Sequence, residues 1–182
     1  YLLYSSAAFT RFTISANSGF GSFQRGGGVF CESTPNATFT EGVIKDNVGP
    51  YLGGGIAVSP AMYDSSSFHV DLTNVLIQNN TSIQWGGGIY GSNISLSGCT
   101  IKENTATYSG GGIYNENFLI DGEISFSPTN RCNIYSNTVI EPNEVGNDIA
   151  ISVDYYDIHQ SLMEVILDTF TVLTPTDYYA TP

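Results

Sequence analysis

The sequence has few positive charges and few charged residues of any kind. Of its 182 residues only 5 are Lys or Arg, whereas 17 are Asp or Glu, so the formal net charge is −12, and charged residues make up 12%. A surface with so few cations has little with which to neutralise phosphate groups or anionic lipid headgroups. We therefore expect neither nucleic acid nor a membrane surface as a partner.

Long apolar runs are also missing, and cysteine is rare. No run of about 18 apolar residues occurs, so we expect no direct insertion of this fragment into a membrane. The three cysteines have no C-x-x-C spacing, and they predict neither a zinc site nor a disulfide-stapled fold. The first residues include neither an initiator Met nor a basic stretch, which is typical of a mature fragment or an excised domain.

Aromatic residues and glycine, by contrast, are plentiful. Aromatics make up 13% of the chain, and 20 residues are Gly. Disordered chains combine low hydrophobicity with dense charge, so this composition predicts a folded body. A chain of this length is long enough for one domain with a continuous core.

Two short motifs recur in a fixed order along the chain. Ile-x-x-Asn occurs five times, at Ile14 and Asn17, Ile44 and Asn47, Ile77 and Asn80, Ile101 and Asn104, and Ile134 and Asn137. Glycine triplets follow at 26–28, 53–55, 86–88 and 110–112, and Gly146-Asn147-Asp148 is a degenerate fifth. In the three middle repeats the first Gly always lies six residues after the Asn. Such constancy indicates a structural repeat.

Apolar and polar residues alternate within each repeat, which predicts strands. The shortest spacing between successive motif Asn residues is 24, and the others are 30 or 33, so the extra residues are interpreted as loops. Short strands in a unit of this size predict an all-β fold, a right-handed single-stranded parallel β-helix of about six or seven coils. We expect it to span residues 1–153, with 154–182 as an irregular C-terminal cap or junction of the same domain.

Stacking of such coils assigns a role to the repeated residues. The five motif Ile residues are predicted to form one interior ladder, since equivalent positions face each other about 4.8 Å apart. The five motif Asn residues are predicted to form a turn ladder, because Asn tolerates left-handed backbone and can pair amide to amide. The glycine triplets would supply positive φ and close approach between coils. Cys99 and Cys132 share one repeat position, which favours buried free thiols over a disulfide bond.

The pairing of Gly-Gly-Gly-Ile with Ile-x-x-Asn resembles a known pattern. It is similar to the GGA(I/L/V) and FxxN repeats of chlamydial polymorphic outer-membrane proteins, and to Gly-Gly-Gly-Ile-Tyr repeats in secreted bacterial parallel β-helix proteins. The resemblance covers about residues 12–150, with Ile here in place of Phe and Gly in place of Ala. It implies a β-helix and a secreted or surface passenger, and it implies no particular ligand.

Two insertions lengthen the repeats on one side. Residues 59–72 and the stretch from Asn115 to Arg131 both lie between a glycine triplet and the next Ile-x-x-Asn. Insertions gathered on one face often form the binding face of a repeat protein. Beyond the repeats, residues 163–173 are predicted to form one or two strands, with a short helix around residues 158–165 as the alternative.

Acidic residues concentrate near the C-terminus. Residues 121–182 contain ten acidic residues and one Arg, a net charge of −9. Clustered carboxylates suit Ca²⁺, so Asp148, Asp154 and Asp157 are candidate ligands, although no calcium-binding motif occurs and no cofactor is required. The alternative is that these acids only solvate the surface.

No catalytic residue is predicted. Glycoside hydrolysis needs two facing acids, and Asp121 with Glu123 share one face of a strand-like stretch, but scattered solvating acids are the favoured interpretation. His69 and His159 have no Ser, Cys or acid at a recognisable motif spacing, so they are interpreted as ordinary surface residues.

The function indicated is structural or adhesive. We expect part of a secreted or cell-surface bacterial protein, either an adhesin-like passenger or a rigid spacer, with a glycan or a host or cell-surface protein as partner. The alternative is a β-helix that binds or cleaves a neutral polysaccharide. Its candidate ligand face comprises Trp85, Tyr90, Tyr114, Asp121 and Glu123, since aromatic rings stack on sugars.

Overall fold

The structure is a computed structural model. It describes residues 1–19, 25–34, 36–59, 68–117, 124–142, 146–153 and 178–180. Within these ranges every regular element is a β-strand. No helix of the described part is long and apolar enough to cross a membrane.

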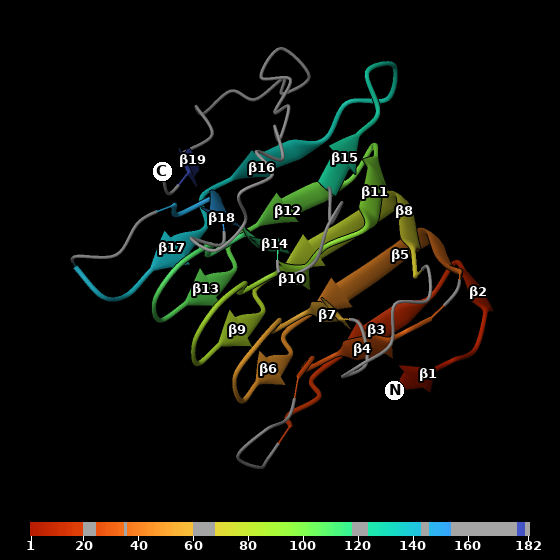
Figure 1. The fold of residues 1–182 in the computed structure, drawn as a ribbon, viewed down its shortest axis with the longest axis horizontal. Coiled ribbons are helices and arrows are strands. Elements are labelled where there is room, and N and C mark those ends of the chain that lie inside the picture. The colour runs from red at the N-terminus through yellow and green to blue at the C-terminus, as the bar shows by residue number, and fades with distance from the viewer. Residues whose placement is uncertain are drawn as a thin grey trace.

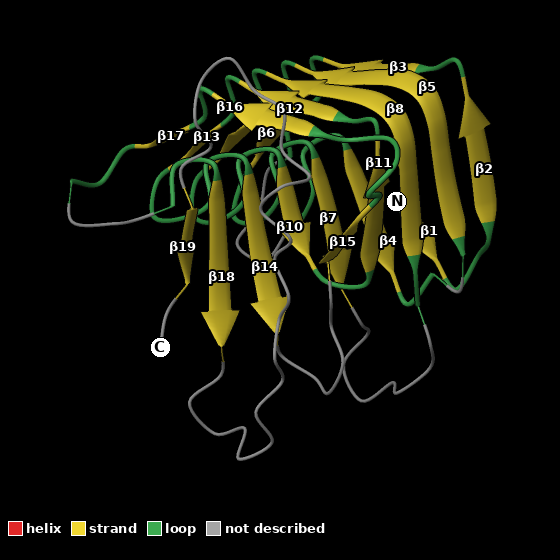
Figure 2. Cartoon of the chain, turned by 90° about the horizontal axis from the view of Figure 1, so that it is seen from above, coloured by secondary structure: helices red, strands yellow, loops and turns green. Residues whose placement is uncertain are grey.

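The described strands form three parallel sheets (Figures 1 and 2). Sheet A contains, in spatial order, β1 (Leu2–Leu3), β4 (Val29–Glu32), β7 (Ile56–Ser59), β10 (Ile89–Gly91), β14 (Ile113–Asn117), β18 (Ile149–Val153) and β19 (Tyr178–Ala180). Sheet B contains β2 (Ala7–Thr10), β3 (Thr13–Ser15), β5 (Ala37–Lys45), β8 (Val70–Gln78), β11 (Ile94–Ser97), β12 (Thr100–Lys102), β15 (Ile124–Phe126) and β16 (Asn133–Tyr135). Sheet C contains β6 (Val48–Gly49), β9 (Thr81–Ser82), β13 (Thr105–Ala106) and β17 (Thr138–Val139).

The chain passes from sheet A to sheet B to sheet C and back in each coil. Strands that are neighbours in a sheet therefore come from successive coils, and they pair in parallel, as between β5 and β8. Figure 2 shows the coils stacked side by side around a common interior. The predicted parallel β-helix is confirmed.

The interior is filled by columns of equivalent apolar residues. The motif isoleucines pair in register from Ile14 through Ile44, Ile77 and Ile101 to Ile134. The four from Ile44 onward are fully buried. A second column from sheet A runs through Val29, Ile56, Ile89, Ile113 and Ile149. β-branched side chains suit both columns, because each packs on its own copy in the next coil.

The corners of the coil are made by left-handed residues. One column lies immediately before the motif Asn residues and comprises Ala16, Asp46, Asn79, Glu103 and Ser136, with φ between 54° and 57°. The sequence suggested left-handed backbone at the motif Asn itself, and this expectation is wrong. The turn falls one residue earlier because the motif Asn must direct its side chain inward, where from the second coil on it is buried.

The middle glycine of each triplet allows neighbouring coils to touch. A Cβ atom on Gly54 would lie 2.4 Å from the carbonyl oxygen of Gly87, and one on Gly87 would lie 2.3 Å from that of Gly111. No side chain fits between two backbones at this distance. The first glycine of each triplet is needed for a different reason, because it adopts a positive φ that other residues disfavour, for example 64° at Gly53 and 66° at Gly86.

Both predicted insertions begin from the same sheet. β7 ends at Ser59 and β14 ends at Asn117, and the two strands flank β10 in sheet A. Residues 60–67 and 118–123 themselves lie outside the described residues, as do the strands expected over 163–173 and the alternative helix around 158–165. From the C-terminal segment only β19 is described, and it extends sheet A beside β18.

Candidate functional site

The motif asparagines form a continuous amide ladder through the corner between sheets B and C. The side-chain Nδ2 of Asn17, Asn47, Asn80 and Asn104 each donates to the Oδ1 of the motif Asn in the following coil, at 2.9 Å in every case. The same Oδ1 also accepts a hydrogen bond from the backbone N–H of the preceding motif Asn; for example, Asn80 N–H donates to Asn104 Oδ1. Each acceptor thus serves two donors, and the ladder binds successive coils together.

Asp148 closes the ladder at its C-terminal end. Its Oδ1 accepts from the Nδ2 of Asn137 at 2.7 Å and from the backbone N–H of Asn137 at 3.1 Å. Asp148 occupies the position of the third triplet glycine, where a Cβ on Gly112 would lie 2.8 Å from Asn137 Nδ2. In the earlier coils, the side chain of the motif Asn in the following coil fills the space beside the third glycine. At the end of the ladder, the side chain of Asp148 itself fills this space.

Of the three candidate calcium ligands, only Asp148 belongs to the described residues. Asp148 is 3% exposed, and one of its oxygens is engaged by Asn137. Asp154 and Asp157 lie outside the described residues. Among the residues that are described, no group of three His, Cys, Asp or Glu side chains could hold a metal ion.

The outer surface of sheet A carries a column of three aromatic and two alanine side chains, which we call the aromatic face. In register along it lie Phe30, Ala57, Tyr90, Tyr114 and Ala150. The rings of Tyr90 and Tyr114 stack with centroids 5.7 Å apart and planes 2° from parallel. Tyr90 is nevertheless only 2% exposed, so the centre of this face is covered rather than open to a ligand.

The accessible part is the margin of that face next to the glycine corner, which we call the aromatic edge: Trp85, Tyr108 and Tyr114. The ring of Trp85 lies 6.0 Å from that of Tyr108 and 5.9 Å from that of Tyr114. Tyr108 is 38% exposed, and the other two are partly exposed. Of the predicted ligand-face residues, Trp85 and Tyr114 thus lie together, while Asp121 and Glu123 are outside the described residues.

Polar groups also lie on the outside of sheet A. Ser59 accepts a hydrogen bond from the guanidinium of Arg25. Burial raises the pKa of Glu116, and the charge of Arg25 opposes this effect only in part. Glu116 follows Tyr114 by two residues on β14, so the two side chains leave the same face of sheet A.

Sequence reasoning missed one cluster on the outside of sheet B. His69 Nε2 lies 3.2 Å from Asp71 Oδ1 and 2.9 Å from Ser95 Oγ, and that hydroxyl lies 3.0 Å from Ser125 Oγ. A nucleophilic triad needs the acid on one ring nitrogen and the hydroxyl on the other. Here both contact Nε2, so the arrangement is not a triad. An alignment of the repeats on Ile77 and Ile101 also places Asp71 beside Ser95. This register could have predicted the cluster from the sequence.

The three cysteines are free and buried. Cys99 donates its backbone N–H to the sulfur of Cys132 at 3.4 Å, so the two occupy one column on adjacent coils. Burial raises the pKa of the Cys31 thiol to about 12. Because all three side chains are buried, none of them lies in an open site where a thiolate would react.

We expect native Cys31 to resist alkylation. With a pKa near 12, the thiolate is scarce at pH 8, and the side chain is 0% exposed. Iodoacetamide should label Cys31 at least about 100-fold more slowly in the folded protein than in urea, because the unfolded thiol has an ordinary pKa of about 8.5. Mass spectrometry of the peptide containing Cys31 measures both rates, and equal rates would contradict the buried position.

These features define a parallel β-helix repeat protein. Two stretches of the chain, residues 74–92 and 98–116, match the model of the Chlamydia polymorphic membrane protein repeat. They are adjacent repeats, and each contains one Ile-x-x-Asn and one glycine triplet. No curated protein matches the chain, and no solved structure does. The repeats support, coarsely, a bacterial protein associated with the surface or the outer membrane.

Proposed function

We propose that this β-helix is an adhesin-like passenger of a bacterial cell-surface protein, a rigid rod that presents a binding face to an outside partner. The observation that carries the proposal is the unbroken amide ladder from Asn17 to Asp148. It ties every coil to the next by hydrogen bonds in a buried corner. Stability built from contacts between neighbouring coils suits a stiff element that projects from a surface.

The aromatic edge is the place where we propose the partner binds. Trp85, Tyr108 and Tyr114 group partly exposed rings in one place, and aromatic clusters are frequent centres of recognition. With 5 basic residues in the chain, the partner is a protein or a neutral glycan rather than a polyanion.

The test compares two aromatic variants in an adhesion assay. Beads coated with the purified protein are incubated with cultured epithelial cells and with immobilised matrix proteins. Trp85→Ala should lower bead binding at least about five-fold, as expected for a contact worth about 1 kcal/mol or more. Tyr135→Ala removes a partly exposed ring from sheet B and should leave binding unchanged. Failure of the unmodified protein to bind any surface would favour a spacer and refute the adhesive role.

The second candidate function is binding or cleavage of a neutral polysaccharide. It is favoured by the aromatic edge together with Glu116, which follows Tyr114 by two residues on β14 and whose pKa is raised by burial. A glycan array tests binding, and a panel of neutral polysaccharides analysed for released sugars tests cleavage. Glycan binding lost in Trp85→Ala without sugar release would support a lectin-like role, and binding of no glycan would dismiss this candidate.

A further inference from the structure

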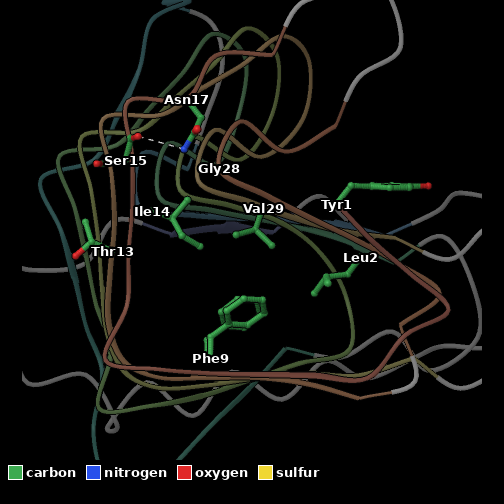
Figure 3. A pocket seen from close by; sticks show the side chains of 10 residues that line it. Tyr1, Leu2, Phe9, Thr13, Ile14, Ser15, Asn17, Gly28 and Val29 are labelled. Carbon is green, nitrogen blue, oxygen red and sulfur yellow. Dashed lines mark hydrogen bonds between the residues drawn. The ribbon is translucent and has the colours of Figure 1, made fainter.

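The largest cavity, of about 450 Å³, lies inside the first coil, where Leu2, Phe9 and Ile14 point into it, and it is part of the solenoid interior (Figure 3). The outside of sheet C is a different kind of surface. Figure 1 shows its strands β6, β9, β13 and β17 lying side by side. Its first outward column contains, in register, Val48, Thr81, Thr105 and Thr138. A second column, two residues further along the chain, contains Ile83, Thr107 and Ile140. We call these seven β-branched residues the threonine face.

Several apolar side chains of the threonine face are open to solvent. Ile140 is 59% exposed, Ile83 is 55% exposed and Val48 is 41% exposed. Apolar side chains that are gathered on one surface, rather than scattered singly, mark a place of interaction. The threonine face is therefore a candidate binding surface that is separate from the aromatic edge.

The threonine face carries no charge. None of its seven side chains is ionisable, although the chain as a whole has a net charge of −12. Two acidic residues of the adjoining corner, Asp46 and Glu103, form ion pairs with Lys45 and Lys102 of sheet B. In its charge, the face is thus complementary to an uncharged partner.

The backbone beside the amide ladder fixes the spacing of the first column. Each of its members directly follows a motif Asn and donates its backbone N–H to the carbonyl oxygen of the motif Asn in the preceding coil. The four hydrogen bonds measure 2.8 Å at Val48, Thr81 and Thr105 and 2.9 Å at Thr138. Coils therefore repeat evenly, at about 4.8 Å, and residues two apart along a strand repeat at about 6.6 Å. β-branched side chains have few rotamers, so their methyl and hydroxyl groups keep the same spacing.

The hydroxyl groups of the first column are available to water. Within the described ranges, no protein group makes a hydrogen bond with the hydroxyl of a threonine in that column. The outside of sheet B differs, because Ser95 Oγ and Ser125 Oγ lie 3.0 Å apart and Asp71 adds a carboxylate beside them. Of the two surfaces, only the threonine face combines rigid methyl groups with hydroxyl groups that do not bond to each other.

Such an array orders the water that lies on it. Water next to methyl groups loses orientational freedom, and hydroxyl groups hold water by hydrogen bonds. Both kinds of group repeat here in two directions, at distances comparable to the repeat distances of the ice lattice. The ordered water over the threonine face can therefore join the surface of an ice crystal.

We propose that the threonine face binds ice, through a layer of water that its methyl and hydroxyl groups hold in place. The partner is an uncharged, periodic solid, which matches the absence of charge and the even repeat of the face. The inference does not rest on the proposed adhesive role.

Capture of the protein by growing ice tests the proposal. A single ice crystal is grown slowly in a solution of the protein, and the protein content of the ice is compared with that of the liquid. The unmodified protein should enter the ice well above the level of a non-binding protein of the same size. Thr105→Lys should lower the captured fraction at least about five-fold, because the lysine charge would lose its hydration against the crystal.

Thr73→Lys is the matched control, since Thr73 is also a partly exposed threonine, but on the outside of sheet B. It should leave capture unchanged, and circular dichroism checks that each variant is folded. Thr107→Lys replaces Thr105→Lys if the latter does not fold. Exclusion of the unmodified protein from ice overturns the proposal, and so does equal capture of Thr105→Lys or an equal loss in Thr73→Lys.

Two further measurements address other occupants of the face. The protein is mixed with powdered crystalline cellulose and chitin, and it should stay in solution. Binding to either powder that is lost in Thr105→Lys, without capture by ice, would identify an ordered polysaccharide as the partner and overturn the proposal. Light scattering should show a monomer, and a dimer that Thr105→Lys abolishes would identify a second copy of the chain and also overturn it.

Discussion

Asn104→Ala is expected to destabilise the protein by about 3–5 kcal/mol. Asn104 is 0% exposed, and its side chain makes four hydrogen bonds: it accepts from the backbone N–H and the Nδ2 of Asn80, and it donates to Asn137 Oδ1 and to the carbonyl of Ile77. Alanine leaves two buried donors of Asn80 without their acceptor. Urea unfolding followed by circular dichroism measures the loss in free energy of unfolding.

Asn17→Ala is the matched control for this prediction. Asn17 makes the same donor contact to Asn47, but its own Oδ1 serves no donor in the described residues and its side chain is exposed. Removing it should cost about 1 kcal/mol, the typical net value of one hydrogen bond. If the two variants lose the same stability, the ladder is not a cooperative tie between coils, and the stiffness argued for the rod fails.

The sequence was sufficient to predict the register of the fold. Ile77 and Ile101 pair in register, as their equivalent positions in the Ile-x-x-Asn motif predict. The glycine triplets form the corners where neighbouring coils touch. This worked because the repeat encodes geometry directly: an interior column needs the same side chain in every coil. A repeat therefore reveals contacts that ordinary sequences hide.

The corner conformations could not be read in the same way. Glu103 and Ala16 adopt left-handed backbone although neither residue favours it, with φ of 56° in each. The strain is imposed by stacking, because the next residue must point its amide into the ladder. The intrinsic backbone preference of Asn predicted the left-handed residue at the motif Asn, whereas stacking on the neighbouring coil places it one residue earlier.

The candidate site was less predictable than the fold. Trp85 and Tyr114 were expected on a ligand face and lie together, but Tyr90 is covered, since neighbours along the aromatic face pack against it. The place of Asp148 at the end of the amide ladder, where it accepts from Asn137, was not expected from the sequence. A repeat pattern predicts which way a side chain points; it does not predict what lies over it.

Gly87→Ala is expected to destabilise the solenoid strongly. The added Cβ would lie 2.3 Å from the carbonyl oxygen of Gly111 and 2.5 Å from the carbonyl carbon and oxygen of Thr105. All three are backbone atoms of the following coil, so the clash is relieved only if two coils separate. Separation would break both the strand pairing and the side-chain hydrogen bond from Asn80 to Asn104. We expect a loss of about 4 kcal/mol or more, or failure to fold.

Gly42→Ala provides the comparison, because it also adds one methyl group to a crowded glycine. There the nearest atoms, at 2.3 Å, belong to the ring of Phe12, a partly exposed side chain of the first coil. A ring can rotate away where a backbone cannot, so this variant should lose about 1 kcal/mol or less. Urea unfolding gives both losses, and hydrogen exchange in β10 and β14 locates the damage, which Gly87→Ala should concentrate there. Equal losses in the two variants would show that the triplets do not set the distance between coils, and that close stacking, on which the rod depends, comes from the interior columns alone.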